Sequence, residues 1–297
     1  MKKVVLSVVA ALAMTATVPA LAADMPVKAK PVAPAAAPSP WDVLFGVAFT
    51  TDYELRGVSQ SAHKPAVQGY FEVDYTVTDW LKLYAGVWGS SLYTGFADAE
   101  FDISGGARLS WGNFGLDLGY VYYEYPDGTA NGFGSFGEFY AKPSYKFTDW
   151  LTVGGVIDGG WDFNNKVCLV GLCPVATGTG VWTGNADAGY YSANAVITLP
   201  WHPIQDVTIS INPEIGRQWY SSSVNANLGA SSYTYWDVGL DFNWKAITLD
   251  LRYWDTDTSR AGGNAVCFIN QAGNTSDACS ARFVATLKFD TSISQLK

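Results

Sequence analysis

Large apolar side chains alternate with smaller or polar ones along this chain, beginning with WDVLFGVAFTTDYELRG at residues 41–57. Most of the large apolar side chains in this stretch occupy odd-numbered positions, and every charged side chain falls on an even-numbered one. A period of two is typical of a β-strand with two unlike faces. The alternation recurs along the chain and predicts antiparallel strands at residues 41–57, 66–77, 81–91, 99–111, 114–125, 136–147, 151–163, 190–201, 207–220, 235–244, 247–256 and 281–289.

The connections between these strands alternate between long and short. The short turns lie at residues 78–80, 112–113, 148–150, 202–206 and 245–246, and the connections between them are longer. Outer-membrane barrels have short periplasmic turns and longer external loops, and a tilted strand needs ~9–11 residues to cross the bilayer. The pattern therefore predicts an all-β fold, an antiparallel up-and-down transmembrane barrel of about twelve strands.

The placement of charge indicates which face of each predicted strand meets lipid. The large-apolar face carries charges only near the long-loop end, at Glu124, Arg217 and Asp255. A lipid-facing Arg or Lys costs ~2–4 kcal/mol at the bilayer midplane, and the many ionised groups of the opposite face could not fill a dry core. We therefore expect the apolar face to meet lipid and the other face to line a wet lumen. The candidate pore-lining residues are Asp52, Glu54, Arg56, Glu72, Asp74, Lys82, Glu100, Asp102, Arg108, Glu138, Lys142, Asp158, Glu214, Arg252 and Arg282.

Tryptophan collects at one end of the predicted barrel. One tryptophan begins the first strand, and one lies at or beside each short turn. Indole rings favour the membrane–water boundary, where the apolar ring and its N–H can both be satisfied. The predicted aromatic girdle consists of Trp41, Trp80, Trp111, Trp150, Trp201 and Trp244.

The segment before residue 41 has a different composition. Residues 1–22 combine a basic start, an apolar run and the small-x-small site Ala20-Leu21-Ala22, which indicates a signal peptide. Alanine, threonine and Pro19 in the run favour cleavage over a membrane anchor. Residues 23–40 are rich in Pro and Ala and are expected to form an extended periplasmic linker. The barrel and its long external loops then occupy residues 41–297, and export predicts the outer membrane of a Gram-negative bacterium.

Two prolines and the end of the chain fit the strand pattern less well. Pro143 and Pro213 fall inside predicted strands, where each removes a ladder hydrogen bond, so we expect bulges or register changes. The last predicted strand closes the barrel at Phe289, where an aromatic residue suits recognition by the barrel-insertion machinery. The alternation assigns no role to residues 290–297.

Net charge argues against one class of partner. The formal net charge is −9, and loss of Lys2 and Lys3 with the signal peptide would make it −11. An acidic chain has no electrostatic reason to bind nucleic acid.

Charge inside the barrel leaves two functions open. The inward positions carry about twice as many acids as bases, which predicts a porin-like channel for ions or small hydrophilic solutes that mildly prefers cations. The alternative is a structural or adhesive barrel that acts through its external loops, its lumen plugged by acids paired with Arg56, Arg108, Arg252 and Arg282. About eight strands are filled by side chains and about sixteen leave an aqueous channel, so twelve is compatible with both.

The cysteines form two local pairs in long loops, Cys168 with Cys173 and Cys267 with Cys279. Oxidation is expected in an exported protein, and local pairing is the simplest of the three connectivities that four cysteines allow. No histidine or Cys-x-x-Cys accompanies them, so we expect neither a metal site nor a cofactor.

Histidine, on which serine or acid–base catalysis generally depends, occurs only at His63 and His202. His63 follows Ser59 and Ser61 in a predicted external loop, and His202 lies in a short turn. We expect both to be solvated loop residues. We therefore expect no catalytic residues, and we do not expect the protein to be an enzyme.

The run FTTDYELRGVSQSAHKPAVQGYFEVDY at residues 49–75 resembles the opening signature of the TorF-family porins, outer-membrane proteins first grouped under an uncharacterised conserved domain. A looser similarity covers the rest of the barrel, including the TDWL turns at residues 78–81 and 148–151. The resemblance implies a lipid-embedded barrel with a transport role and no catalytic residues, and it leaves open whether barrels form homo-oligomers. The matching elements are Asp52-Tyr53, Arg56-Gly57, Ser59-Gln60-Ser61, Pro65-Ala66, Gln68-Gly69 and Pro213-Glu214.

Overall fold

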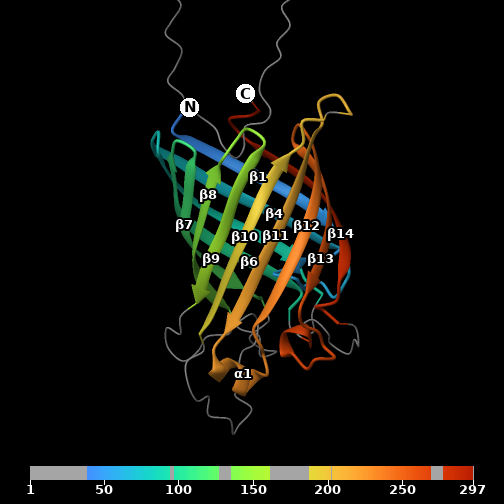
Figure 1. Ribbon diagram of the computed structural model, residues 1–297. Coiled ribbons are helices and arrows are strands. Elements are labelled where there is room, and N and C mark those ends of the chain that lie inside the picture. Colours follow the sequence, from blue (N-terminus) through green and yellow to red (C-terminus); the bar gives the residue numbers. More distant parts are fainter. Residues whose placement is uncertain are drawn as a thin grey trace, which may run out of the picture. The chain divides into compact units, whose positions relative to one another are not determined.

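The computed structural model describes residues 39–93, 97–126, 135–160, 187–201, 203–268 and 277–296. In this part of the chain, long antiparallel strands close into one barrel in the order β1-β14-β13-β12-β11-β10-β9-β8-β7-β6-β5-β4 (Figure 1). The predicted twelve-stranded antiparallel barrel is therefore confirmed. The strands are β1 Trp41–Thr50, β4 Ala66–Thr78, β5 Leu81–Ser91, β6 Ala99–Trp111, β7 Phe114–Glu124, β8 Phe136–Lys146, β9 Leu151–Gly160, β10 Ala188–Thr198, β11 Thr208–Tyr220, β12 Tyr233–Trp244, β13 Ile247–Thr256 and β14 Arg282–Ser292.

The two faces of the barrel wall differ as alternation requires. Phe283 is 82% exposed and Ile157 is 61% exposed on the outward face, whereas Asp74, Glu100 and Glu138 are buried on the inward face. A large contiguous apolar surface of this kind is unsuited to water and suited to a lipid environment. Each strand of the closed sheet is hydrogen-bonded to a neighbouring strand on both sides, so the barrel has no open edge. No helix among the described residues is long and apolar enough to cross a membrane.

The tryptophans of the predicted girdle lie at the short-turn end of the barrel. Because the strands form an up-and-down series, the start of β1 and the five short turns share one end. The rings of Trp80 and Trp111 stack with their centroids 6.1 Å apart. All six side chains are exposed, a position that suits the boundary between lipid and water: Trp41, Trp80, Trp111, Trp150, Trp201 and Trp244.

Strands β1 and β14 close the barrel, and β14 runs past the predicted end at Phe289. Leu44 pairs with Ser292 and Gly46 pairs with Asp290, so three residues assigned to an unexplained tail belong to the closing strand. After the strand, the backbone N–H of Ser294 donates to Asp42 at 3.0 Å and its hydroxyl donates to the same carboxylate at 2.6 Å. The C-terminal segment thus secures the start of β1.

The first predicted strand is too long. β1 ends at Thr50, and the chain then turns into a small hairpin of β2 (Glu54–Leu55) and β3 (Val58–Ser59). Arg56 and Gly57 form its tip in the left-handed region, with φ of 52° and 78°, which glycine adopts without a steric penalty. We call residues 51–65 the inserted hairpin.

The predicted irregularities at Pro143 and Pro213 do not occur. Pro143 pairs with Leu116 and Pro213 pairs with Val238 in continuous registers. On the other side of each proline the pairing skips a few positions and resumes in the same register. A single missing N–H therefore interrupts one ladder locally, while the flanking hydrogen bonds keep the strands aligned. The register shifts instead between Thr76 and Thr78 of β4.

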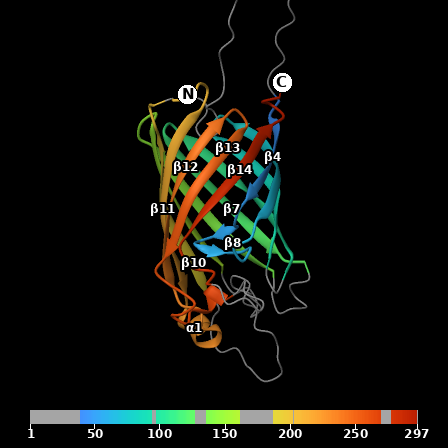
Figure 2. The same ribbon diagram turned by 90° about the vertical axis from the view of Figure 1, so that its right-hand side faces the viewer.

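The long-loop end carries a small core of buried apolar side chains. Helix α1 (Ser222–Leu228) marks this end in Figure 2, opposite the end that holds the short turns. The helix begins at Ser221, whose hydroxyl accepts from Val224, and ends at Gly229 in the left-handed conformation. Short helix η2 (Ala265–Phe268) carries Cys267, whose Sγ lies 2.10 Å from that of Cys279 in a disulfide. Cys168 and Cys173 lie outside the described residues.

Candidate functional site: the barrel lumen and its inserted hairpin

The barrel wall and the inserted hairpin together supply the predicted pore-lining residues. Asp52, Glu54 and Arg56 lie in the inserted hairpin, so their assignment to a membrane-spanning strand is wrong. The remaining residues lie on the wall, on strands β4, β5, β6, β8, β9, β11, β13 and β14: Glu72, Asp74, Lys82, Glu100, Asp102, Arg108, Glu138, Lys142, Asp158, Glu214, Arg252 and Arg282.

Arg56, at the tip of the inserted hairpin, reaches the wall on one side of the lumen. Its guanidinium lies 2.7 Å from Glu138 on β8 and 2.7 Å from Asp158 on β9. It also donates to the amide oxygen of Gln218 on β11 at 2.9 Å and lies over the ring of Tyr190 at 4.3 Å. The Arg56 side chain is 10% exposed, so these contacts replace most of its solvation.

Arg282 holds the inserted hairpin from the opposite side. This β14 guanidinium lies 2.7 Å from Glu54 and 3.6 Å from Asp52. Since β14 and β8 lie on opposite sides of the closed barrel, Arg282 and Glu138 together fix the hairpin across the lumen. Burial, only partly offset by Arg282, raises the pKa of Glu54 well above its ordinary value, and the charge of Asp52 adds to the rise.

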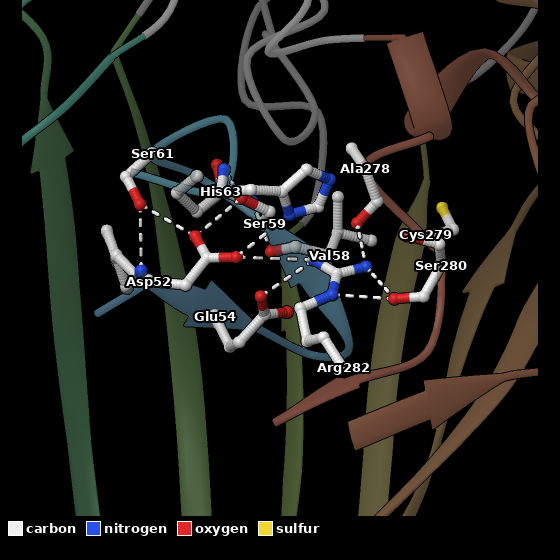
Figure 3. A network of polar contacts seen from close by, with 12 residues as sticks. Asp52, Glu54, Val58, Ser59, Ser61, His63, Ala278, Cys279, Ser280 and Arg282 are labelled. Atoms are coloured by element: carbon white, nitrogen blue, oxygen red, sulfur yellow. Dashed lines mark hydrogen bonds and ion pairs between the residues drawn. The ribbon is translucent and has the colours of Figure 1, made fainter. Parts of the chain in front are cut away.

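Asp52 organises the inserted hairpin from within (Figure 3). Ser59 and Ser61 donate hydroxyl hydrogen bonds to Asp52 Oδ1 at 2.6 and 2.7 Å, and His63 Nδ1 lies 3.0 Å from Oδ2. Burial acts to raise the pKa of Asp52, but hydrogen bonds from His63, Ser59 and Ser61 outweigh it and hold that pKa below its ordinary value. The segment is therefore built around an ionised carboxylate.

His63 is not the solvated loop residue that the sequence suggests. Besides Asp52, its Nε2 lies 3.0 Å from the carbonyl oxygen of Asp277, and its side chain is only 29% exposed. Ser59 and Ser61 both donate to Asp52 instead of contacting the imidazole through their hydroxyls. The described residues of this segment thus lack the serine–histidine contact of a nucleophilic triad. His202 lies outside the described residues.

Arg108 forms a second charged network on the wall, nearer the short-turn end of the barrel than the inserted hairpin. Its guanidinium donates to both oxygens of Glu72, at 2.7 and 2.9 Å, and lies 3.3 Å from Asp74 and 3.5 Å from Asp117. Lys82 contacts Asp74 at 2.9 Å. The Lys82 side chain is 42% exposed and that of Arg108 is 36% exposed, although both face the interior. This part of the lumen is accordingly hollow enough to hold water.

Arg252 forms a third network, with Asp237 and with Asp250, the latter at 3.3 Å. Lys288 also lies 3.3 Å from Asp250, and its side chain is 38% exposed. All four arginines that the sequence singled out therefore pair with acids, as the plugged alternative expected. The networks of Arg108 and Arg252 join side chains of the barrel wall to each other. The pairs of Arg56 and Arg282 join the wall to the inserted hairpin.

Lumen tyrosines are candidate site residues that sequence reasoning missed. Tyr84 donates to Asp117 at 2.6 Å and contacts the hydroxyl of Tyr140, and Tyr190 donates to Glu214 at 2.8 Å beside Tyr235. Tyr84, Tyr190 and Tyr235 thus donate to lumen carboxylates, Asp117 and Glu214. The available signal was parity, since Tyr84, Tyr140 and Tyr235 share the even or odd numbering of the charged positions on their own strands. Strand β10, which carries Tyr190, has no charged position and gave no such signal.

A partly open cavity of about 220 Å³ lies in the lumen, lined by Lys142, Asp102 and Asp158 among aromatic residues. Its position beside the inserted hairpin follows from Asp158, which lines the cavity and also binds Arg56. The geometry provides a polar space with both signs of charge. It does not resemble a metal centre, and the described Cys267–Asp277–Cys279 group has its sulfurs bonded to each other.

Comparison with known proteins finds similar folds at low identity. The NanC porin shares 11% identity and a TM-score of 0.45, covering 84% of this chain and 98% of that one. The KdgM porin shares 8% identity and a TM-score of 0.44 over 84% and 98%. An outer membrane channel from Pseudomonas putida F1 shares 11% identity and a TM-score of 0.47 over 87% and 97%. Similarities this low do not indicate what the present chain transports.

The family comparison is more direct. No curated protein matches the chain. A family model described as "Bacterial protein of unknown function (Gcw_chp)" matches residues 34–286, which include the inserted hairpin and the first part of the closing strand β14. The chain therefore belongs to the Gcw_chp family of bacterial proteins of unknown function.

Proposed function

We propose that this protein is an outer-membrane channel for passive diffusion of ions or small hydrophilic solutes. The observation that carries the proposal is the hydration of its interior. Lys82, Arg108 and Lys288 face inward in the short-turn half of the lumen and keep more than a third of their side-chain surface exposed, within a closed barrel whose outer face is apolar. A plugged core would bury such charges, whereas a water-filled lumen leaves them solvated.

The inserted hairpin supplies the constriction of this channel. It is the described segment that crosses the lumen, and its charged contacts reach β8, β9 and β14. These ties are ionic and hydrogen-bonded, so the width of the opening depends on whether they hold. The channel is therefore expected to be narrow, and solutes that pass the hairpin must pass charged groups.

An excess of acid in the lumen supports a mild preference for cations. Buried oxygens of Asp102, Asp158, Asp237 and Asp241 lack a hydrogen-bond partner among the described residues. A lumen lined by such groups raises the local concentration of cations and disfavours anions.

The reversal potential in a KCl gradient tests the proposal. The refolded protein in a planar bilayer should show discrete current steps, with a reversal potential of the sign that marks preference for K⁺. Lowering the pH to protonate lumen carboxylates should move the reversal potential towards zero. Preference for chloride at neutral pH would contradict the role assigned to the acids.

The alternative, a plugged barrel acting through its loops, is favoured by one observation. Arg56, Arg108, Arg252 and Arg282 all pair with acids. A correctly folded barrel that passes no current, while deletion of an external loop abolishes binding to a surface or partner, would favour this function over the channel.

We further infer a place for this chain among the TorF-like porins in a Gram-negative outer membrane, inserted by the barrel machinery. The support is the run at residues 49–75. Its matching elements lie in the inserted hairpin and in the first residues of strand β4. We assign no catalytic role to His63, because its ring is engaged by Asp52 and Asp277.

A further inference from the structure

Lys142 differs from the other basic side chains of the lumen wall. Arg108, Arg252 and Lys82 each have a carboxylate oxygen within 4.0 Å. Among the described residues, none lies that close to Lys142, whose Nζ instead lies over the ring of Tyr140 at 4.3 Å from its centroid. Lys142 lines the cavity and is exposed to it. An ammonium group in this position is free to bind an anionic group of a solute.

Two carboxylates of the same cavity also have unused capacity. Asp102 Oδ1 and Asp158 Oδ1 are buried and lack a hydrogen-bond partner within the described part of the chain. The Asp158 side chain is 9% exposed, and its other oxygen is held 2.7 Å from Arg56. A buried carboxylate oxygen without a donor is costly to leave unpaired, so a donor from a bound solute would be favourable.

The rest of the cavity lining is mostly aromatic, with Ser104 and Val121 beside the rings. Trp88 and Tyr123 line it together with Tyr140, and the ring of Trp88 packs on Tyr53 of the inserted hairpin with centroids 5.4 Å apart. Aromatic faces provide apolar contact for a small side chain and also attract an ammonium group. The cavity of about 220 Å³ has room for a solute of several non-hydrogen atoms, since one water needs roughly 10–15 Å³ of such space.

We propose that this cavity is a binding site for a small zwitterionic solute of the α-amino acid class. Lys142 binds the carboxylate, Asp102 and Asp158 accept hydrogen bonds from the ammonium group, and Trp88 and Tyr123 contact the side chain. The inference deepens the proposed channel function by naming a solute class for its constriction. A simple inorganic cation would use the two acids but leave Lys142 without a role, and a plain carboxylate would leave the acids unsatisfied.

Binding in detergent micelles tests this inference without requiring any current. L-leucine is compared by isothermal titration calorimetry with leucinamide, which lacks the carboxylate, and with 4-methylpentanoate, which lacks the ammonium group. We expect leucine to bind at least about ten-fold more tightly than either analogue, because each analogue leaves one set of charged partners unpaired. Equal affinities for all three compounds, or no binding of leucine, would overturn the inference.

Three variants separate the two ends of the site. Lys142→Gln should weaken leucine binding about ten-fold and leave leucinamide unaffected, whereas Asp102→Asn should weaken both. Lys82→Gln is the matched control, because Lys82 also faces the lumen but lies outside the cavity and pairs with Asp74. It should bind leucine as the unmodified protein does. Retention of a heat-modifiable band in each variant confirms that the barrel is folded before binding is compared.

Current measurements on the same preparations keep this inference distinct from the channel proposal. Leucine binding without ion current would contradict the channel and retain the site. Ion current without leucine binding would retain the channel and overturn the site. If both hold, leucine should reduce the KCl current of the unmodified protein at about ten-fold lower concentration than that of Lys142→Gln.

Discussion

Asp52 accepts hydrogen bonds from Ser59 and Ser61 and contacts the imidazole of His63, so three side chains of the inserted hairpin converge on one carboxylate. Glu54, two residues later, is in a different situation, because burial opposes its charge more strongly than Arg282 favours it. Ionisation of Asp52 therefore stabilises the docked hairpin, whereas ionisation of Glu54 opposes docking, so the two acids give docking opposite dependences on pH.

The signs of these two effects follow from linkage. The pKa of Asp52 is lowered on folding, so its contribution to stability is present above the ordinary carboxyl range and is lost as the pH falls through the lowered value. The pKa of Glu54 is raised on folding. Its ionised form therefore opposes docking above the raised value, and that opposition disappears as the pH falls through it.

We predict that Asp52→Asn weakens the docking of the inserted hairpin at neutral pH by about 1.5–3 kcal/mol, the usual range for hydrogen bonds to a charged group. Glu54→Gln should weaken docking less than Asp52→Asn does, because the loss of the ion pair with Arg282 is offset by the loss of an opposed buried charge. Hydrogen exchange of the Ser59 and Gln60 amides measures this, because they donate to Ala278 and Tyr53. Equal loss of protection in both variants would contradict the assignment of opposite signs.

At the scale of the element, β1 shows how the barrel is closed. A Cβ on Gly46 would lie 2.5 Å from the Tyr70 ring, 2.5 Å from Asp290 and 2.7 Å from the carbonyl oxygen of Phe289. Glycine thus lets the Tyr70 side chain cover β1 and lets β14 approach it closely. Gly69 on β4 is a neighbouring glycine with more space, since its Cβ would lie 3.4 Å from the Gly46 carbonyl oxygen.

We predict that Gly46→Ala destabilises the closed barrel by about 1–3 kcal/mol through overpacking, whereas Gly69→Ala is nearly neutral. The fraction of protein that migrates in the folded position on gel electrophoresis without heating, as a function of temperature, measures the difference. A loss of the same size in both variants would mean that closure does not depend on the space at Gly46.

Alternation was a sound guide to the strands and a poor guide to the first long connection. Strands β5, β6 and β13 have the bounds that the pattern predicts, and the other long strands except β1 differ from their predicted bounds by a few residues. Residues 51–57 continue the same alternation, yet they leave the wall, because Arg56 and Gly57 adopt positive φ values and Asp52 binds Ser59 and Ser61. The odd–even pattern along one strand contains no information on the hydrogen bonds that side chains form within a folded-back segment.

The same alternation predicted which charged side chains face the lumen. It did not predict the partners of these side chains. Arg56 reaches the lumen as expected, although it does so from a hairpin and not from a strand. Its binding to Glu138 and Asp158 depends on contacts separated by 82 and 102 residues. Such pairings are set by strand register and by the path of the hairpin, neither of which the local pattern contains.

At the scale of the whole molecule, the outward face must tolerate lipid. Leu251 lies in the middle of β13 and Ile247 lies at its short-turn end, on the same face, with exposed fractions of 43% and 37%. We predict that Leu251→Arg lowers the free energy of unfolding in lipid vesicles by ~2–4 kcal/mol and that Ile247→Arg costs ~0–1 kcal/mol. Denaturant titration measures both. Equal costs at the two depths would argue against a membrane-spanning β13.

The central claim is that the inserted hairpin narrows a hydrated lumen and is held there by Arg56. Removing the guanidinium leaves Glu138 and Asp158 unneutralised beside each other and weakens the docking on that side of the barrel. Arg108→Gln is the matched control, because Arg108 pairs with Glu72, Asp74 and Asp117 on the wall and does not contact the hairpin.

The most direct test is the single-channel conductance of the unmodified protein, of Arg56→Gln and of Arg108→Gln in a planar bilayer. We predict small discrete steps for the unmodified protein, steps roughly two-fold larger for Arg56→Gln because the constriction widens, and a smaller change for Arg108→Gln. Silence from all three folded barrels, or equal conductance of the unmodified protein and Arg56→Gln, would contradict the account.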